Sequence, residues 1–270
     1  MKKYLLVFSI LVLVYACSRN PYRATNRIYK KESVNLSRQL KSIPEVPAND
    51  TIHQPPYFVG TTNFNLRKPN YVIIHHTAQN SCPATLKTFT IPAAQVSAHY
   101  VICKDGTIYH MLNNYLRAWQ AGVSSWGNDK DINSSSIGIE LDNNGFELFD
   151  SAQIKSLLSL LSRLKKTYNI PTANFIGHGD IAPARKNDPN YRFPWQLLAQ
   201  HGFGNWYDTM ITDTVPNHFN TLAALRIIGY NVRDTSAAII AFKRHFLQDT
   251  TPGMNEQAKR ILYNLHKKYL

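Results

Sequence analysis

Between residues 71 and 177 the apolar positions of the chain fall into short runs that have the length of β-strands. The clearest run, Tyr71–His76 (YVIIHH), is almost wholly apolar before its two final histidines, which predicts a buried strand. Lys104-Asp105-Gly106 contains the Asp-Gly pair of a tight hairpin turn and lies between two further runs. Strands are therefore predicted at 71–76, 97–103, 107–110, 136–141 and 174–177.

The longest periodic segment predicts a helix at 151–168. Its apolar residues recur at helical spacing and therefore share one face: Ile154, Leu157, Leu158, Leu161, Leu164 and Tyr168. Asp150 or Ser151 can cap the first turn, and the basic residues near the end suit the helix dipole. Strands interleaved with helices predict an α/β domain over 57–207, with a mixed central sheet flanked by helices.

After Val215-Pro216 only helical spacing remains. Leu222, Leu225 and Ile228 are spaced by three residues, and later apolar groups continue the helical pattern as far as Tyr269. This pattern predicts three short helices that form a small bundle over 217–270. The bundle is either a stabilising appendage of the α/β domain or a separate binding module.

The N-terminus has the pattern of a secretory signal peptide at 1–16. Two lysines precede an apolar stretch, Tyr4–Ala16, that is too short to cross a bilayer, because a spanning helix needs about 20 apolar residues. Val14-Tyr15-Ala16-Cys17 resembles a bacterial lipobox, which implies cleavage before Cys17 and lipidation of that cysteine. An ordinary signal peptide followed by an unrelated cysteine is the alternative.

The chain is strongly basic, since 30 Lys and Arg outnumber 17 Asp and Glu and give a formal charge of +13. Residues 17–56 are rich in Arg, Lys, Asn, Ser and Pro without a sustained apolar period, and are predicted to form a flexible tether. A basic surface suits nucleic acid, anionic lipid or an acidic wall polymer. The secretory signal and the lack of a nucleic-acid-binding motif argue against nucleic acid as a partner.

The remaining composition is that of a folded protein with an apolar core, because 44% of the residues are hydrophobic. Three cysteines are too few for a fold built on disulfides. Cys82 and Cys103 either pair with each other in an oxidising compartment or remain as two buried thiols.

Three segments carry candidate chemistry. His75 closes the first predicted strand, Glu140 lies at the end of another, and Gly177-His178-Gly179 opens a polar loop that contains Asp188. Two histidines and one carboxylate from separate segments match the ligands of a catalytic zinc site, in which a fourth position is left for water. A plain ion pair between Asp and His is the alternative interpretation of the same residues.

With these segments in place, the chain resembles the zinc-dependent N-acetylmuramoyl-L-alanine amidases of the type 2 family, which share their fold with peptidoglycan recognition proteins. The matching stretches are YVIIHHTA (71–78), SAHYVICKDGTIY (97–109), RAWQAGVSSW (117–126), SIGIELDN (136–143) and GHGDIAPARKNDPNYRFPW (177–195). The lipobox, the basic tether and the helical tail further resemble the lipoprotein amidases of the bacterial outer membrane. The tail itself resembles a degenerate peptidoglycan-binding module.

The resemblance implies a role for each matched residue. Zinc is expected to be held by His75, His178 and Asp188. Glu140 matches the catalytic carboxylate, and Lys186 matches the cationic residue beside the metal. His76 is expected to point to the other side of its strand, because neighbouring side chains alternate between faces.

Four further residues are candidates for contact with the substrate. Gln120 stands where close relatives usually carry His, at a position that borders the substrate. His99 matches a family histidine that is not a ligand, and is either structural or substrate-facing. Trp119 and Trp126 either stack on a sugar or belong to the core.

The function implied is hydrolysis of the amide between the lactyl group of N-acetylmuramic acid and L-alanine, with peptidoglycan or its fragments as partner. The expected location is the bacterial cell envelope, with a lipid anchor on Cys17 in the outer membrane and the domain facing the periplasm. The rival is a peptidoglycan-binding lipoprotein that kept the fold and lost catalysis. Loss of a zinc ligand is the usual sign of such a protein, and all matched residues are present here.

Overall fold

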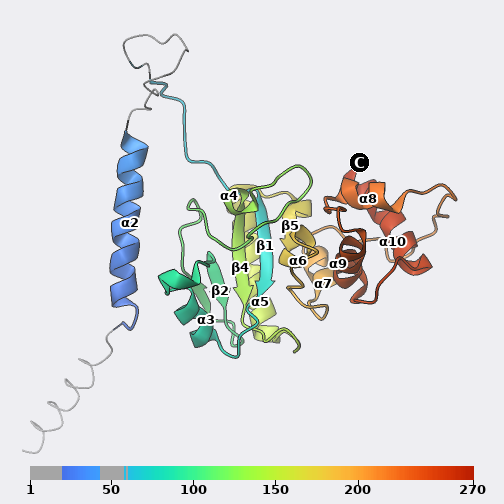
Figure 1. The fold of residues 1–270 in the computed structure, drawn as a ribbon, viewed down its shortest axis with the longest axis horizontal. Coiled ribbons are helices and arrows are strands. Elements are labelled where there is room, and N and C mark those ends of the chain that lie inside the picture. The colour runs from blue at the N-terminus through green and yellow to red at the C-terminus, as the bar shows by residue number, and fades with distance from the viewer. Residues whose placement is uncertain (1–19, 43–57, 59) are drawn as a thin grey trace, which may run out of the picture. The chain divides into compact units, whose positions relative to one another are not determined.

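The computed structural model describes residues 20–42, 58 and 60–270, and the chain divides into two compact units between Asn65 and Leu66. In the described part, the first unit contains one helix, and the second contains the sheet and the other helices (Figure 1). The predicted signal peptide at 1–16 and the candidate lipidation site Cys17 lie outside the described residues. Within the described ranges, no helix has the length and apolar character needed to cross a bilayer.

The segment predicted as a flexible tether contains a helix, α2 (Arg23–Lys41). None of its residues is buried, so its own backbone hydrogen bonds hold it rather than packing on a core. The sequence has neither Gly nor Pro between 23 and 41, while Pro21 and Pro44 stand on either side. The structure thus has a helix in a segment for which the sequence showed no sustained apolar period, and the role of residues 17–56 as a tether stays a prediction.

Five strands form one sheet in the order β3-β2-β4-β1-β5. They are β1 (Tyr71–His76), β2 (Tyr100–Ile102), β3 (Ile108–His110), β4 (Ser136–Leu141) and β5 (Phe175–Gly177). β1 pairs in parallel with β4 and β5, and β2 pairs in parallel with β4 but antiparallel with β3. The predicted mixed α/β sheet is confirmed, although β2, β3 and β5 are shorter than their apolar runs.

Helices connect the strands and continue beyond the sheet (Figure 1). The α-helices of the second unit are α3 (Cys82–Thr88), α4 (Ile132–Ser135), α5 (Ser151–Tyr168), α6 (His178–Ile181), α7 (Trp195–Gln200), α8 (Thr221–Ile228), α9 (Thr235–Leu247) and α10 (Glu256–His266). Three short 3₁₀ turns are η1 (Pro92–Ala94), η2 (Thr172–Asn174) and η3 (Lys267–Tyr269). The prediction of a helix at 151–168 and of three helices in 217–270 is confirmed.

The alternation of side chains along β1 separates two hydrophobic cores. Val72 and Ile74 pack in the core that contains the apolar face of α5. Ile73 packs in the second core, together with residues of the C-terminal helices. His75 therefore shares the side of β1 that faces away from α5. Glu140 lies on the same side of β4, since its neighbours Ile139 and Leu141 belong to the α5 core.

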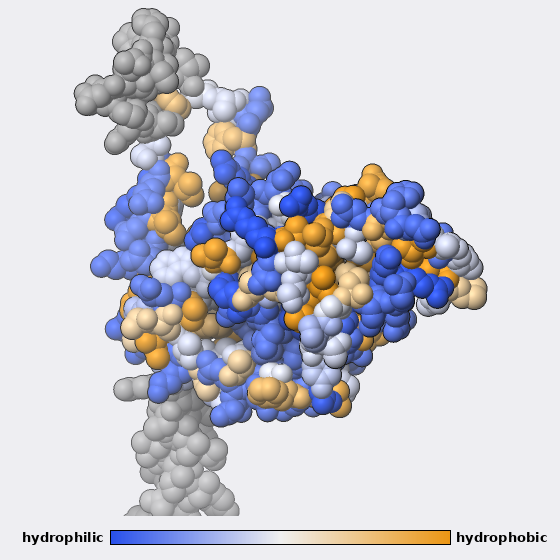
Figure 2. Space-filling model, turned by 45° about the vertical axis from the view of Figure 1, so that its right-hand side comes forward, coloured by the Kyte–Doolittle hydropathy of each residue, from blue (hydrophilic) through white to orange (hydrophobic). Residues whose placement is uncertain are grey.

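The C-terminal helices pack on the sheet rather than forming a core of their own. Leu225, Phe242 and Leu262 share one cluster with Ile73 and Ile176 of the sheet. Figure 2, in which these helices come forward, shows hydrophobic residues as separate patches among hydrophilic ones. Residues 66–270 are thus one compact unit, unlike the separate domains expected at 57–207 and 217–270. The apolar faces of the three short helices are therefore buried partly against the sheet rather than only against one another.

A disulfide links Cys82, at the start of α3, to Cys103, directly after β2. The two Cα atoms lie 5.4 Å apart, which is an ordinary spacing for paired cysteines. Of the two alternatives left open by the sequence, the structure therefore has the disulfide.

We expect Leu262→Ala to lower the free energy of unfolding of residues 66–270 by about 2–5 kcal/mol, as is usual for truncation of a buried leucine. Leu262 is fully buried in the cluster shared by sheet and helices, so the cavity weakens both. Denaturant unfolding, followed by circular dichroism and tryptophan fluorescence, should show one transition that moves to lower denaturant concentration. Leu270→Ala, at an 86% exposed side chain, is the control and should leave the midpoint in place. A second transition that Leu262→Ala alone displaces would mean that the helices form an independent domain.

Candidate functional site

Three parallel strands bring polar side chains to one edge of the sheet. His75 lies near the end of β1, and in the strand register it stands opposite Glu140 of β4. His178 follows directly after β5 and begins α6. The carboxyl ends of parallel strands meet at one edge, which is the usual place for a binding site in α/β sheets. Residues that are about 40 to 100 positions apart in sequence thereby become neighbours.

His75, His178 and Asp188 form a compact, buried group whose candidate ligand atoms all lie within 4.8 Å of one another. Asp188 Oδ2 lies 3.0 Å from His75 Nδ1 and 3.1 Å from His178 Nδ1. Although burial raises the pKa of Asp188, its close contacts with His178 and His75 hold that pKa well below its usual value. The carboxyl group is therefore ionised at neutral pH.

The opposite ring nitrogens of the two histidines are bound to carbonyl oxygens. His75 Nε2 donates to Gln120 Oε1 at 2.5 Å, and His178 Nε2 donates to the Ala121 carbonyl at 3.1 Å. A carbonyl oxygen only accepts, so each Nε2 carries a proton, and each Nδ1 is the atom that faces Asp188 and would bind a metal. Burial lowers the pKa of His178 to about 4, which keeps its ring neutral. Two imidazole lone pairs and a carboxylate converge on one space, and this donor set fits a zinc ion.

Glu140 lies beside this group without joining it. Its Oε1 is 4.0 Å from His75 Nδ1. Its Oε2 is buried and has no hydrogen-bond partner in the described part of the chain. Burial raises the pKa of Glu140 to about 7, and Asp188 adds to the rise, while His75 and Lys186 oppose it. A carboxyl group with a free oxygen and a pKa near neutrality is suited to accept and return a proton.

Lys186 and its neighbour Arg185 behave differently. Lys186 is exposed, and its side chain makes no hydrogen bond or ion pair with the described residues, although its charge acts on Glu140. Arg185, which the sequence did not single out, donates through Nη2 to the carbonyls of Ala121 and Val123 at 2.7 and 3.0 Å. It thus fixes the loop whose carbonyl binds His178. In the sequence, the only signal for Arg185 was its position next to Lys186 within the motif at 177–195.

Gln120 contacts a histidine of the candidate metal site. Its amide nitrogen donates to Ser136 Oγ at 2.8 Å, while its oxygen accepts from His75. Gly138 of β4 makes room for it, because a Cβ there would come within 2.6 Å of Gln120 Cγ. Gln120 therefore orients His75, and because it is only partly buried, its predicted place at the border of the substrate stays a prediction.

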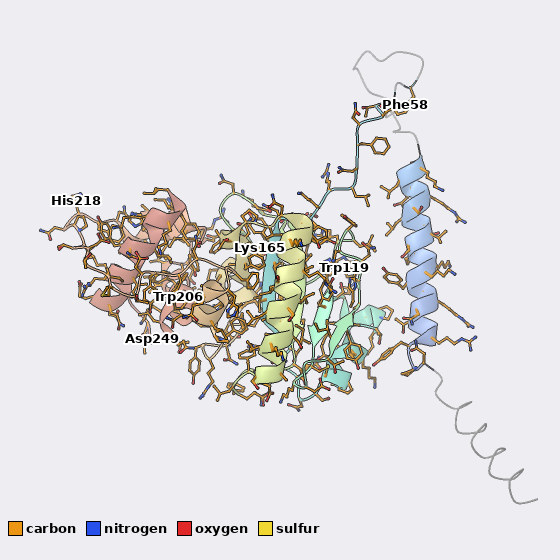
Figure 3. All side chains as sticks on the ribbon, turned by 180° about the vertical axis from the view of Figure 1, so that it is seen from behind. Phe58, Trp119, Lys165, Trp206, His218 and Asp249 are labelled. Carbon is orange, nitrogen blue, oxygen red and sulfur yellow. A yellow bond between two sulfur atoms is a disulfide. The ribbon has the colours of Figure 1, made fainter. Side chains whose placement is uncertain are left out.

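Two other predicted substrate contacts lie in the core. His99 is fully buried, accepts from the Gly138 amide at 3.1 Å and donates to the Leu116 carbonyl, and burial lowers its pKa to about 4. Trp126 is 7% exposed and packs edge-on against Tyr230. Both are structural, because neither ring reaches the surface. Trp119, labelled in Figure 3, is 54% exposed and stays a candidate for substrate stacking.

The histidine next to the first candidate ligand points away from the site, as expected. His76 Nδ1 accepts a hydrogen bond from the backbone amide of Asn190 at 3.0 Å. Burial lowers the pKa of His76, so its ring is neutral.

The C-terminal helices hold the segment that carries His178. Asp180, two residues further along α6, accepts from the Gly177 amide and the Tyr230 hydroxyl, each at 2.9 Å. His245 of α9 lies with Nδ1 2.7 Å from the same carboxyl group. Sequence reasoning missed this network, since Tyr230 and His245 stand in no recognisable motif. The candidate metal site therefore depends on residues from both ends of the second unit.

An α/β fold with a buried His-His-Asp group beside an unpaired glutamate defines a candidate metal-dependent hydrolase. The family model described as N-acetylmuramoyl-L-alanine amidase matches residues 65–191. The N-acetylmuramoyl-L-alanine amidase AmiD of Escherichia coli is 34% identical over an alignment of 230 residues, and the match covers 73% of this chain and 82% of that protein. The chain belongs to the N-acetylmuramoyl-L-alanine amidase family.

Solved structures of related proteins resemble the fold over most of its length. One is E. coli AmiD in complex with the substrate anhydro-N-acetylmuramic acid-L-Ala-D-γ-Glu-L-Lys, with a TM-score of 0.68 and 29% identity, covering 81% of this chain and 97% of that one. Another is AmpDh3 of Pseudomonas aeruginosa in complex with an anhydromuramic pentapeptide, with a TM-score of 0.69 and 28% identity, covering 84% and 99%. Both similarities extend well beyond the segment that the family model matches.

We expect Gln120→Leu to weaken zinc binding by about 10- to 100-fold, the usual effect of losing the partner of a ligand histidine. Leu keeps the bulk of the side chain but has no oxygen to accept from His75 Nε2. Competition with a chromogenic chelator measures the affinity, and circular dichroism checks the fold. Trp119→Leu, at the adjacent exposed side chain, is the control and should bind zinc as the wild type does. Equal affinity of Gln120→Leu and wild type would contradict the orienting role.

Proposed function

We propose that this chain hydrolyses the amide between the lactyl group of N-acetylmuramic acid and the L-alanine of a peptidoglycan stem peptide. The observation that carries the proposal is the convergence of His75, His178 and Asp188 beside Glu140, whose Oε2 is buried and unpaired. Membership of the amidase family and the muropeptide-bound structures of two relatives support it. The choice of substrate rests on those relatives, and the choice of reaction rests on the site.

The metal proposed for this site is zinc. His75 and His178 would bind it through Nδ1, and Asp188 through its carboxylate, because these atoms converge and their other polar atoms are engaged or buried. When bound, zinc supplies Lewis acidity, which makes water a stronger nucleophile near neutral pH.

Glu140 is proposed to move the proton. Its Oε2 accepts a proton from the attacking water, and the resulting carboxylic acid then delivers that proton to the leaving nitrogen of L-alanine. Protonation is needed because an amide nitrogen departs poorly as an anion. The raised pKa of Glu140 allows both halves of this transfer near neutral pH.

Lys186 is proposed to stabilise the negative charge that develops on the amide oxygen. Its ammonium group is exposed and unpaired within the described chain, yet close enough to Glu140 to act on its pKa. A cation that is already in place costs no reorganisation when the charge appears. Trp119, which is exposed beside Gln120, is proposed to stack on the sugar.

The rival function is a peptidoglycan-binding protein without catalysis. A non-catalytic protein of this family would be expected to lack one of the candidate metal ligands or Glu140, or to have them blocked. The three candidate ligands and Glu140 are all present and adjacent, so the enzyme is the better supported of the two.

For location, we propose a lipid anchor on Cys17 in the outer membrane, with the catalytic unit in the periplasm. The support is in the sequence: an apolar stretch that leads directly to Val14–Cys17, and an exposed basic helix, α2, a few residues later. The disulfide between Cys82 and Cys103 agrees with an oxidising compartment.

We expect the wild type to release stem peptides that begin with L-alanine from purified peptidoglycan, and to leave glycan strands whose lactyl carboxylates are free. Mass spectrometry of the products identifies the bond. Glu140→Ala should keep zinc and lose about 100-fold or more in rate, because it removes the proton carrier but no ligand. Lys186→Ala should likewise keep zinc and turn over more slowly. Binding to peptidoglycan without release of peptide, with zinc present, would favour the rival function.

The anchor has a separate test. Mass spectrometry of the mature protein should find an N-terminal cysteine, Cys17, that carries lipid. Cys17→Ala should leave the precursor unlipidated and displace the protein from the membrane fraction. An unmodified N-terminus at another residue would make the chain an ordinary secreted protein.

A further inference from the structure

A second pocket, of about 370 Å³, lies where α7 meets the C-terminal helices. Its walls are aromatic, with contributions from Trp195 of α7, from Trp206 and Tyr207 in the following segment, and from Phe246 of α9. Trp206 (labelled in Figure 3) and Tyr207 are partly exposed, so these rings are within reach of a ligand. None of the residues discussed for catalysis lines this pocket.

Glutamines surround the aromatic walls. Gln196, Gln200 and Gln257 line the pocket and are exposed, and their side-chain amides make no hydrogen bond to any described residue. Gln248 completes the set at the end of α9. Each free amide offers two donor hydrogens and an acceptor oxygen. No Lys, Arg, Asp or Glu is among the lining residues, so the polar groups of the pocket are mainly neutral hydrogen-bonding amides.

Trp206 adds an independent observation. Its indole nitrogen is buried and has no hydrogen-bond partner among the described residues. Buried donors are almost always paired in folded proteins, so an unpaired one calls for an acceptor that the chain itself does not supply. An ordered water enclosed beside the nitrogen would provide that acceptor, and the exposed part of the ring stays available to a ligand.

We propose that this pocket binds a neutral N-acetylated sugar ring of a peptidoglycan glycan strand. The apolar face of a sugar ring packs on aromatic side chains, and its hydroxyl and acetamido groups exchange hydrogen bonds with amides such as those of the glutamines. A stem peptide is a poorer match, because its carboxylates would meet no cation here. The choice of this glycan, rather than another, rests on the proposed function.

The pocket is close enough to the candidate metal site to serve the same strand. His245 lines it and also contacts Asp180, two residues from His178. Along the chain, Phe193 of the pocket follows Asp188 by five residues, a span of no more than about 17 Å. A glycan held in the pocket would therefore keep its stem peptides near the catalytic residues.

The test uses the full chain labelled with ¹⁵N-tryptophan and a trisaccharide of N-acetylglucosamine as probe. The chain has four tryptophans, so four indole signals are expected, and Trp206→Phe identifies its own while keeping an aromatic ring in place. The trisaccharide should shift the Trp206 signal and leave Trp126 unchanged. The double variant Gln196→Ala/Gln200→Ala should bind the trisaccharide at least tenfold more weakly. Gln39→Ala, an exposed glutamine of α2, is the control and should bind as the wild type does.

The outcomes separate this proposal from the proposed function. The probe has no lactyl amide, so its binding reports on the pocket whether or not the chain hydrolyses peptidoglycan. A shift of Trp119 alone would place the sugar at the catalytic residues and overturn the proposal. So would a Trp206 shift produced by a free stem peptide and not by the trisaccharide, or wild-type affinity in the double glutamine variant.

Discussion

The meeting of His75 and His178 at the carboxylate of Asp188 is the interaction on which the rest of the structure depends. It joins the end of β1, the start of α6 and the loop beyond it, and it buries a negative charge that needs compensation. Two carbonyl oxygens, from Gln120 and Ala121, turn both imidazoles so that Nδ1 faces that charge. The donor set is therefore held in one orientation by contacts that lie outside it, as a metal site requires.

The C-terminal helices, which the sequence predicted as a separate bundle, support the group formed by His75, His178 and Asp188. Asp180 of α6 is held by Tyr230 and His245, and the apolar residues of α8–α10 share a core with β1 and β5. The C-terminal helices consequently act on the candidate metal site through position, because they hold Asp180 and supply none of the candidate ligands. They also form one wall of the aromatic pocket, so a single packing arrangement orients the ligand residues and shapes a second surface.

Most polar side chains around the candidate metal site are hydrogen-bonded. Glu140 and Lys186, the groups assigned to proton transfer and charge stabilisation, are exceptions among the described residues. Glu140 keeps a buried oxygen without a partner, and its pKa rises to about 7 because burial disfavours the carboxylate. Lys186 has no ion pair in the described chain, whereas the neighbouring Arg185 is fully used in holding the loop at 121–123. Groups that are already hydrogen-bonded stabilise a fold, and groups that are not remain free to act on a substrate.

The sequence by itself determined the five strands, α5 and the three C-terminal helices, since the apolar runs of the strands and the periods of these helices are local properties. It did not indicate the shorter helices α3, α4, α6 and α7. It also pointed to His75, His178, Asp188 and Glu140, whose types and order are family motifs. Only the tertiary structure decided the roles of Gln120, His99 and Trp126, because a side chain's partner depends on which distant strand or helix it meets. The same reason applies to the C-terminal helices: their periodicity predicted that each had an apolar face, but not that this face packs on the sheet.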